Sequence, residues 1–207
     1  MTLSNASKAG AAIFVGAAQF AFFFIVSEIL YSASGTGGYS VSVNYISDLG
    51  AKCPDSGGAC YIPPSSILFD STIALMGLLL LVAAYYFHRA YHWKPATAMI
   101  ALVGAGALGV GLFPETAGIV HSIFDDITFL FAGLAAIVTA RFQKKPMFYF
   151  SIVLGAITLV AILLYRGDFD LGLGAGGMER MVVYPVLLWG LGFGGHLMAV
   201  DQSSTST

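Results

Sequence analysis

Six long apolar runs divide the chain into segments that are each long enough to cross a membrane. They occupy roughly residues 9–32, 66–88, 96–113, 119–140, 147–165 and 180–200. A helix needs about 20 apolar residues to span the hydrocarbon core of a bilayer, which is roughly 30 Å thick. The pattern therefore predicts an all-α, polytopic membrane protein with six transmembrane helices.

The composition supports a membrane protein and argues against a protein that binds nucleic acid. Of the 207 residues, 57% are hydrophobic and only 10% are charged, whereas a soluble domain is about 25% charged. The net charge of −2 provides no basic patch for nucleic acid, so the expected partners are membrane lipids. We expect a single domain over residues 1–200, followed by a disordered polar tail at 201–207.

The charges predict the orientation. Six helices place both termini on one side, together with Lys8, Arg89, Lys94, Arg141, Lys144 and Lys145, while Lys52, Arg166 and Arg180 fall on the other side. Basic residues in short loops prefer the cytoplasm, which predicts cytoplasmic termini. Of the 11 acidic residues, only Asp201 lies on the side of the termini. We therefore expect a cell-membrane protein whose polar site faces the extracytoplasmic side.

The first loop on that side, about residues 33–65, carries two signals. Its stretch CPDSGGAC places Cys53 and Cys60 where a disulfide would clip the loop between the first two helices; two reduced thiols are the alternative. The preceding stretch GGYSVSVNYISDLG alternates small, polar and apolar residues. It predicts either a strand or hairpin, or a short interfacial helix near Asn44 to Leu49.

The fourth apolar run contains candidate catalytic residues. His121 and Asp125 are four residues apart and share a helical face, and Glu115 stands in the short loop before them. A His with neighbouring carboxylates can transfer protons or bind a divalent metal ion. The alternative is a structural cluster in which Asp125 orients His121, because the spacing matches no known metal signature.

Four more charges lie near helix ends on the acid-rich side and are candidate ligand-binding residues: Glu28, Asp70, Glu179 and Arg180. Charges within membrane segments are costly and usually face a partner or a watery cavity. We expect Glu28, Asp70 and Arg180, with Asp125, to form a shared network; independent contacts with water are the alternative. Glu179 is expected in the first helical turn, where the dipole favours an acid. Arg180 is a candidate to hold an anionic ligand group.

Three motifs resemble an uncharacterised family of archaeal and bacterial six-helix membrane proteins, catalogued as domain of unknown function 998. They are SVNYISDLGA, GVGLFPE followed by His121, and GGMERMVVYPVLLWG. The resemblance covers nearly the whole chain. It implies the six-helix architecture, is consistent with an archaeal source, and brings no assigned activity or catalytic residue.

The residues support three functions and leave open whether the protein is an enzyme. The first is a membrane enzyme that acts on a lipid or other amphiphile, with or without a metal ion. The second is an accessory or structural subunit of a larger membrane complex, and the third is a small transporter or receptor. Glycine-rich helix faces permit tight packing within one chain or between copies in a homo-oligomer.

Overall fold

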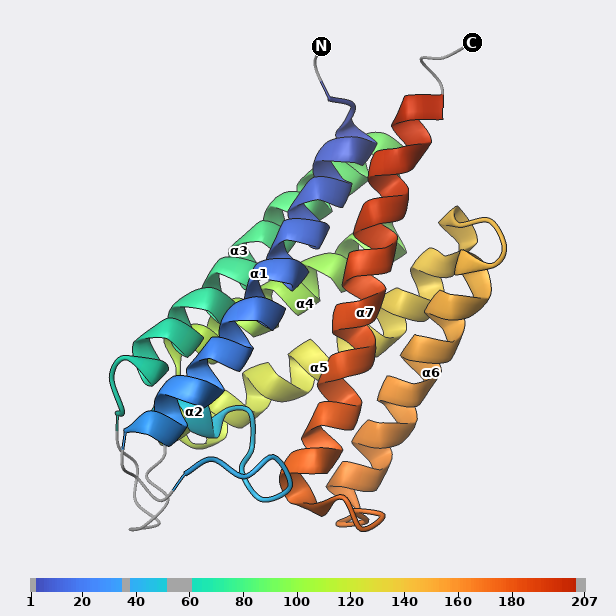
Figure 1. Cartoon of the computed structure of the whole chain (residues 1–207). Coiled ribbons are helices and arrows are strands. Elements are labelled where there is room, and N and C mark those ends of the chain that lie inside the picture. Colours follow the sequence, from blue (N-terminus) through green and yellow to red (C-terminus); the bar gives the residue numbers. More distant parts are fainter. Residues whose placement is uncertain (1–2, 35–37, 52–60, 204–207) are drawn as a thin grey trace.

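The computed structural model describes residues 3–34, 38–51 and 61–203, and within these ranges it is helical without strands. Six helices are long and apolar enough to cross a membrane (Figure 1). The helices are α1 (Asn5–Ala33), α2 (Asp48–Ala51), α3 (Ser65–Tyr91), α4 (Lys94–Leu112), α5 (Ile119–Thr139), α6 (Met147–Arg166) and α7 (Gly174–Ser203), with 3-10 turns η1 (Glu115–Ala117) and η2 (Ala140–Phe142). The predicted six-helix class is confirmed.

The long helices form a closed ring in chain order. Each packs against its predecessor and successor, α1–α3–α4–α5–α6–α7, and α7 closes the ring against α1. The start of α1 and the end of α7 lie at the same end of the bundle (Figure 1). We call this the basic end, since Lys8, Arg89, Lys94 and Arg141 lie there, and we call the opposite end, with Glu28, Asp70, Asp125 and Glu179, the acidic end. The membrane side of each end stays a prediction.

Glycines bring the helix backbones into direct contact. A Cβ atom on Gly10 of α1 would lie 2.6 Å from the carbonyl oxygen of Gly194 in α7, and one on Gly77 of α3 would lie 2.7 Å from that of Gly104 in α4. Small residues at helix interfaces permit this approach, which maximises packing where lipid provides no hydrophobic drive. These four glycines therefore pack within the chain.

Helix α7 begins six residues before the predicted start at residue 180, which corrects the placement of Glu179. The helix begins at Gly174, whose φ is +74°, and Gly176 donates its N–H to the Ser42 carbonyl at 3.1 Å. The carbonyl oxygens of Ser42 and Asn44 occupy the space that a side chain on Gly174 or Gly176 would need. Glu179 consequently lies in the second turn, and the first-turn dipole explanation for it is wrong.

The segment after α1 also resolves one of the two alternatives left by its sequence. Residues 41–44 form turns, and α2 follows at Asp48–Ala51. A short helix is present, as the helical alternative predicted, but it begins at Asp48 rather than near Asn44. The strand alternative is wrong, because this segment packs onto the helix ends and pairs with no neighbouring strand in the described ranges. Helix α2 rests on α3 and contacts η1 and α1, so it covers the acidic end. Cys53 and Cys60 lie outside the described residues, and their disulfide stays a prediction.

Candidate functional site

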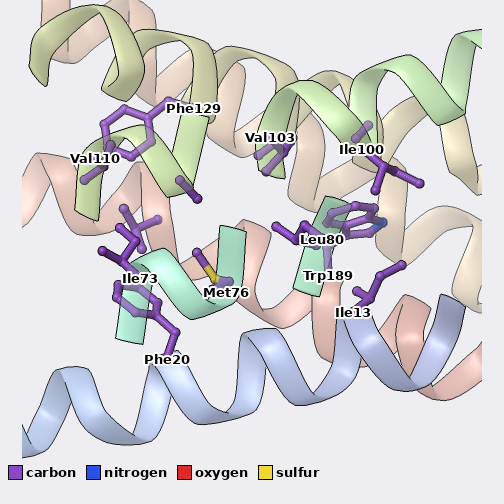
Figure 2. Packing of buried hydrophobic residues seen from close by; sticks show 14 of the residues in the cluster. Ile13, Phe20, Ile73, Met76, Leu80, Ile100, Val103, Val110, Phe129 and Trp189 are labelled. Carbon is purple, nitrogen blue, oxygen red and sulfur yellow. The ribbon is translucent and has the colours of Figure 1, made fainter. Parts of the chain in front are cut away.

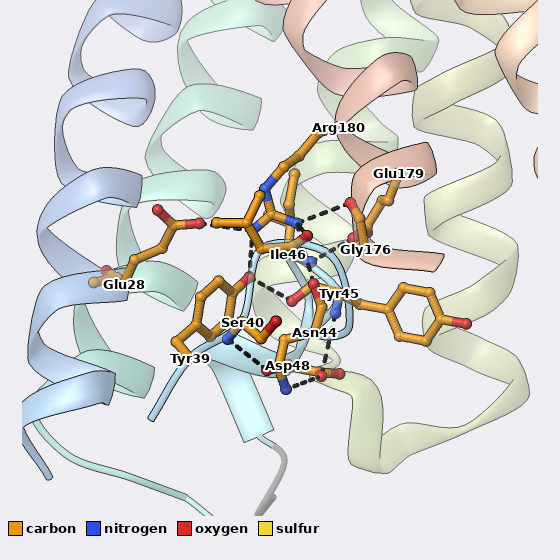
Figure 3. A network of polar contacts seen from close by, with 12 residues as sticks. Glu28, Tyr39, Ser40, Asn44, Tyr45, Ile46, Asp48, Gly176, Glu179 and Arg180 are labelled. Carbon is orange, nitrogen blue, oxygen red and sulfur yellow. Dashed lines mark hydrogen bonds and ion pairs between the residues drawn. The ribbon is translucent and has the colours of Figure 1, made fainter. Parts of the chain in front are cut away.

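Arg180 is the centre of the polar network at the acidic end (Figure 3). It projects from α7 and is only 4% exposed. Within the described residues its guanidinium donates five hydrogen bonds. They go to the carbonyl oxygens of Val41 (3.1 Å), Asn44 (3.1 Å) and Gly176 (2.8 Å), to Oε1 of Glu28 (2.6 Å) and to the hydroxyl of Tyr39 (2.7 Å). The hydrogen bonds of Arg180 therefore hold the loop segment 38–47 against both α1 and α7.

Tyr39 extends this network into the loop. Its hydroxyl accepts from Arg180 and donates to the carbonyl of Tyr45 at 2.7 Å. Burial raises the pKa of the Tyr39 phenol above its ordinary value, and the positive charge of Arg180 opposes this by less. The phenol therefore stays protonated, as its donated hydrogen bond requires.

The loop is also held by its own polar side chains. Asn44 accepts from the Ser40 N–H at 2.9 Å and donates to Asp48 at 3.0 Å. Asp48, which starts α2 and is 2% exposed, also accepts from the Tyr45 N–H at 3.2 Å. Bonds of this kind are typical of Asn and Asp in turns, and they shape the segment that covers the bundle.

Glu179 points away from Arg180 although the two are adjacent in sequence. Successive residues of an α-helix are rotated by about 100°, so α7 presents the two charges to different neighbours. Glu179 is 2% exposed and accepts the N–H of Ile46. Asp125 of α5 lies close enough to interact with it electrostatically. Arg180 thus binds the loop, and Glu179 faces the interior of the bundle.

A central cavity of about 70 Å³ lies inside the ring, and Glu179 and Asp125 both line it. The other lining residues come from α1, α3, α4, α5 and α7 and are almost all apolar, as Figure 2 shows for several of them. Ile46 and Ser47 of the loop also line it, and the buried indole N–H of Trp189 has no hydrogen-bond partner among the described residues. The cavity therefore combines a lipid-like wall with two carboxyl groups.

His121 does not join these carboxyl groups in the cavity. It is buried in α5, its Nδ1 lies 2.8 Å from the carbonyl oxygen of Phe113, and its Nε2 has no partner among the described residues. Asp125 instead has Glu115 and Arg166 as electrostatic neighbours. In the described part of the chain no three His, Cys, Asp or Glu side chains group to hold a metal ion. The predicted trio therefore lacks the ligand geometry of a metal site here.

The predicted network of four charges is divided among separate sites. Glu28 and Arg180 form an ion pair, whereas Asp70 of α3 lies beneath Gly50 of α2 and bonds to the Tyr61 hydroxyl. Burial and the neighbouring carboxylate raise the pKa of Tyr61. Asp125 faces the cavity. A ligand-binding role for these residues stays a prediction, and the Arg180 contacts described above are all with the protein itself.

Two tyrosines at this site had no clear signal in the sequence. Tyr45 and Tyr165 meet edge-on with ring centres 6.1 Å apart, and Tyr165 lies within electrostatic range of both Glu179 and Asp125. Tyr45 stands in the loop and Tyr165 near the end of α6, 120 positions apart, so only the folded chain brings them together. Asn44 and Asp48 had a detectable signal, since they are spaced four apart beside the turn.

Comparisons with known proteins give one match. A family model described as Protein of unknown function (DUF998) matches residues 13–196. No curated protein matches the chain, and no solved structure does. The match covers all six long helices in whole or in part.

Proposed function

The chain belongs to the DUF998 family, and we propose that this member takes the polar end of a single-chain amphiphile, with the first carbons of its chain, into the central cavity and transfers protons there. Asp125 and Glu179 are the acid–base pair in this proposal. The observation that carries it is the position of these two carboxyl groups in the wall of a cavity that is otherwise apolar.

The apolar wall suits the carbons that adjoin the polar end of an amphiphile. Phe20, Ile73, Met76 and Leu80 contribute side chains to it, and burying such surface against a chain is favourable by roughly 25 cal/mol per Å². Methionine side chains adapt readily to irregular ligands, so Met76 can make room where the chain needs it. Ligand pockets commonly combine such walls with a few polar groups that fix the orientation.

The two carboxyl groups provide the chemistry. General acid–base catalysis needs one group that gives a proton and another that accepts one. Glu179 accepts a backbone N–H from Ile46, which holds its carboxyl group in place in the cavity wall. We therefore assign Glu179 and Asp125 together as the pair that gives and accepts the proton. The loop that Arg180 fastens would keep water from the reacting group.

Binding is tested by filling the cavity. Ala132 is buried in α5 and lines the cavity, whereas Ala105 is exposed on α4, so Ala132→Leu and Ala105→Leu add the same atoms inside and outside. We expect native mass spectrometry of protein in nanodiscs to show a bound amphiphile in the wild type and in Ala105→Leu, and none in Ala132→Leu. An unchanged adduct in Ala132→Leu would contradict the cavity as the binding site.

The chemistry is tested by isosteric changes. Asp125→Asn and Glu179→Gln keep size and remove the acid, and Asp126→Asn makes the same change on an exposed neighbour. Incubation with a total lipid extract, followed by untargeted lipid mass spectrometry, should show a product with the wild type and Asp126→Asn but not with the other two. Equal conversion by all four proteins would refute the acid–base pair. An empty cavity together with stoichiometric co-purification of other subunits would favour the accessory role instead.

A further inference from the structure

A second pocket opens at the acidic end, outside the ring of helices. Its volume is about 150 Å³, and it lies between the end of α6, the α6–α7 loop and the first turns of α7. Three aromatic rings and two carboxylates line it, from Tyr45, Tyr165, Phe169, Asp168 and Asp170, together with Ala175 and Met178. It shares none of these residues with the central cavity.

An apolar groove adjoins this pocket on the surface that faces lipid. The groove measures about 410 Å³ and runs along α6 and the start of α7. Val153, Ile157 and Val160 of α6 line it, together with Leu171 of the α6–α7 loop. Met178 lines both the groove and the pocket. The polar pocket and the apolar groove therefore adjoin one another at Met178.

The α6–α7 loop that forms both walls has the composition of a membrane-interface segment. Phe169 is 65% exposed and Leu171 is 70% exposed, which suits residues that insert among lipid head groups. Asp170 accepts the Gly172 N–H at 2.9 Å, so the loop is locally ordered. In a bilayer spanned by α6 and α7, the pocket at their acidic end would open near the head groups and the groove along them would face the acyl chains.

The charges that line the pocket favour a cationic ligand. Asp168 and Asp170 line it, and none of the lining residues is basic. Arg166, the nearest cation in sequence, pairs with Asp126 and stacks over the Tyr165 ring at 5.6 Å, so its charge is already matched. Aromatic faces attract ammonium groups, most strongly where water is partly excluded, and carboxylates add a direct charge attraction.

We propose that the pocket and the groove together bind one membrane lipid whose head group carries an ammonium group. The ammonium lies between the tyrosine and phenylalanine rings beside Asp168 and Asp170, and one acyl chain lies in the groove along α6. This site is independent of the central cavity and of the chemistry assigned to Asp125 and Glu179.

The head-group preference is tested with lipids that differ only in charge. Wild-type protein in nanodiscs of phosphatidylethanolamine, phosphatidylcholine or phosphatidylglycerol is released into the gas phase, and retained lipids are counted by native mass spectrometry. We expect roughly tenfold stronger retention of the two ammonium lipids than of phosphatidylglycerol. The double variant Asp168→Asn/Asp170→Asn should lose this preference, while Asp70→Asn, which removes a carboxylate of α3 that does not line the pocket, should keep it. Asn tolerates the positive φ of residue 168, so the fold is preserved.

Two further measurements distinguish a lipid from a dissolved cation. Ala156→Trp should block the groove and reduce retention of the ammonium lipids severalfold, whereas Ala105→Trp on the lipid-facing side of α4 should not. Tetramethylammonium alone should compete with the lipid head group only weakly, because it gains nothing from the groove. Equal retention of phosphatidylglycerol, or a preference that survives the double variant, would overturn the proposal. So would full competition by tetramethylammonium together with an unaffected Ala156→Trp, which would indicate a site for soluble cations.

Discussion

Replacing Arg180 by methionine is the change for which the structure predicts the largest loss of stability at the acidic end. Methionine keeps much of the length of the side chain and removes its five hydrogen bonds. The Glu28 carboxylate, 19% exposed as a side chain, loses its 2.6 Å partner, and the loop carbonyls of Val41 and Asn44 lose their donor.

The magnitude follows from burial. Removing one partner of a buried ion pair costs about 3–5 kcal/mol, because the remaining charge stays without compensation. Arg166 provides the matched control, since it pairs with Asp126 while the two side chains are 48% and 55% exposed. An exposed pair of this kind contributes about 0–1 kcal/mol. Arg180→Met should therefore lower the free energy of unfolding several times more than Arg166→Met.

The measurement is a denaturant titration of both variants in the same detergent, combined with limited proteolysis of the loop segment 38–47. Glu28→Gln is added to complete a double-mutant cycle with Arg180→Met. Because Gln leaves no charge behind, the double variant should be more stable than the sum of the single losses predicts, by about 1–3 kcal/mol. Strictly additive effects, or a loss for Arg180→Met no greater than for Arg166→Met, would refute the role of Arg180 as the fastener of the loop.

Three further changes test other parts of the structure. Gly10→Ala should destabilise the bundle by forcing α1 from α7, while Gly195→Ala, with no atom within 4 Å of its added Cβ, should be nearly neutral; thermal unfolding compares them. The pKa of Tyr39 is higher in the folded protein than in the unfolded chain, where it is about 10. The stability that the protonated phenol contributes is therefore complete below about pH 10 and is lost as the pH rises above it. Tyr39→Phe should consequently show less alkaline destabilisation than the wild type in a pH series of melting curves. Glu179→Gln retains an acceptor for the Ile46 N–H, whereas Glu179→Ala leaves this donor unpaired at a cost of about 1–3 kcal/mol; equal chemical stability of the two variants would contradict that hydrogen bond.

The sequence predicted some of the polar contacts correctly and others wrongly. The Glu28–Arg180 pair could be expected because both charges lie near helix ends on one side and need compensation. Its partners Tyr39, Val41 and Asn44 could not, since Arg180 binds two of them through backbone carbonyls, which every residue possesses. His121 and Asp125 share a helical spacing, yet only Asp125 lines the cavity. Spacing defines a common face, and the neighbouring helices decide what each part of that face meets.

The sequence by itself determined the six membrane helices, because the length and apolarity of a spanning segment are local properties that a bilayer imposes. Only the tertiary structure decided how the charges at the acidic end are shared. Glu179 and Arg180 are adjacent in the chain, but the turn of α7 directs one to the cavity and the other to α1 and the loop. The tertiary structure also brought Tyr45 beside Tyr165 and formed a pocket and a groove that share Met178 as a lining residue. Such arrangements depend on how the helices pack across long sequence separations, and no local pattern records them.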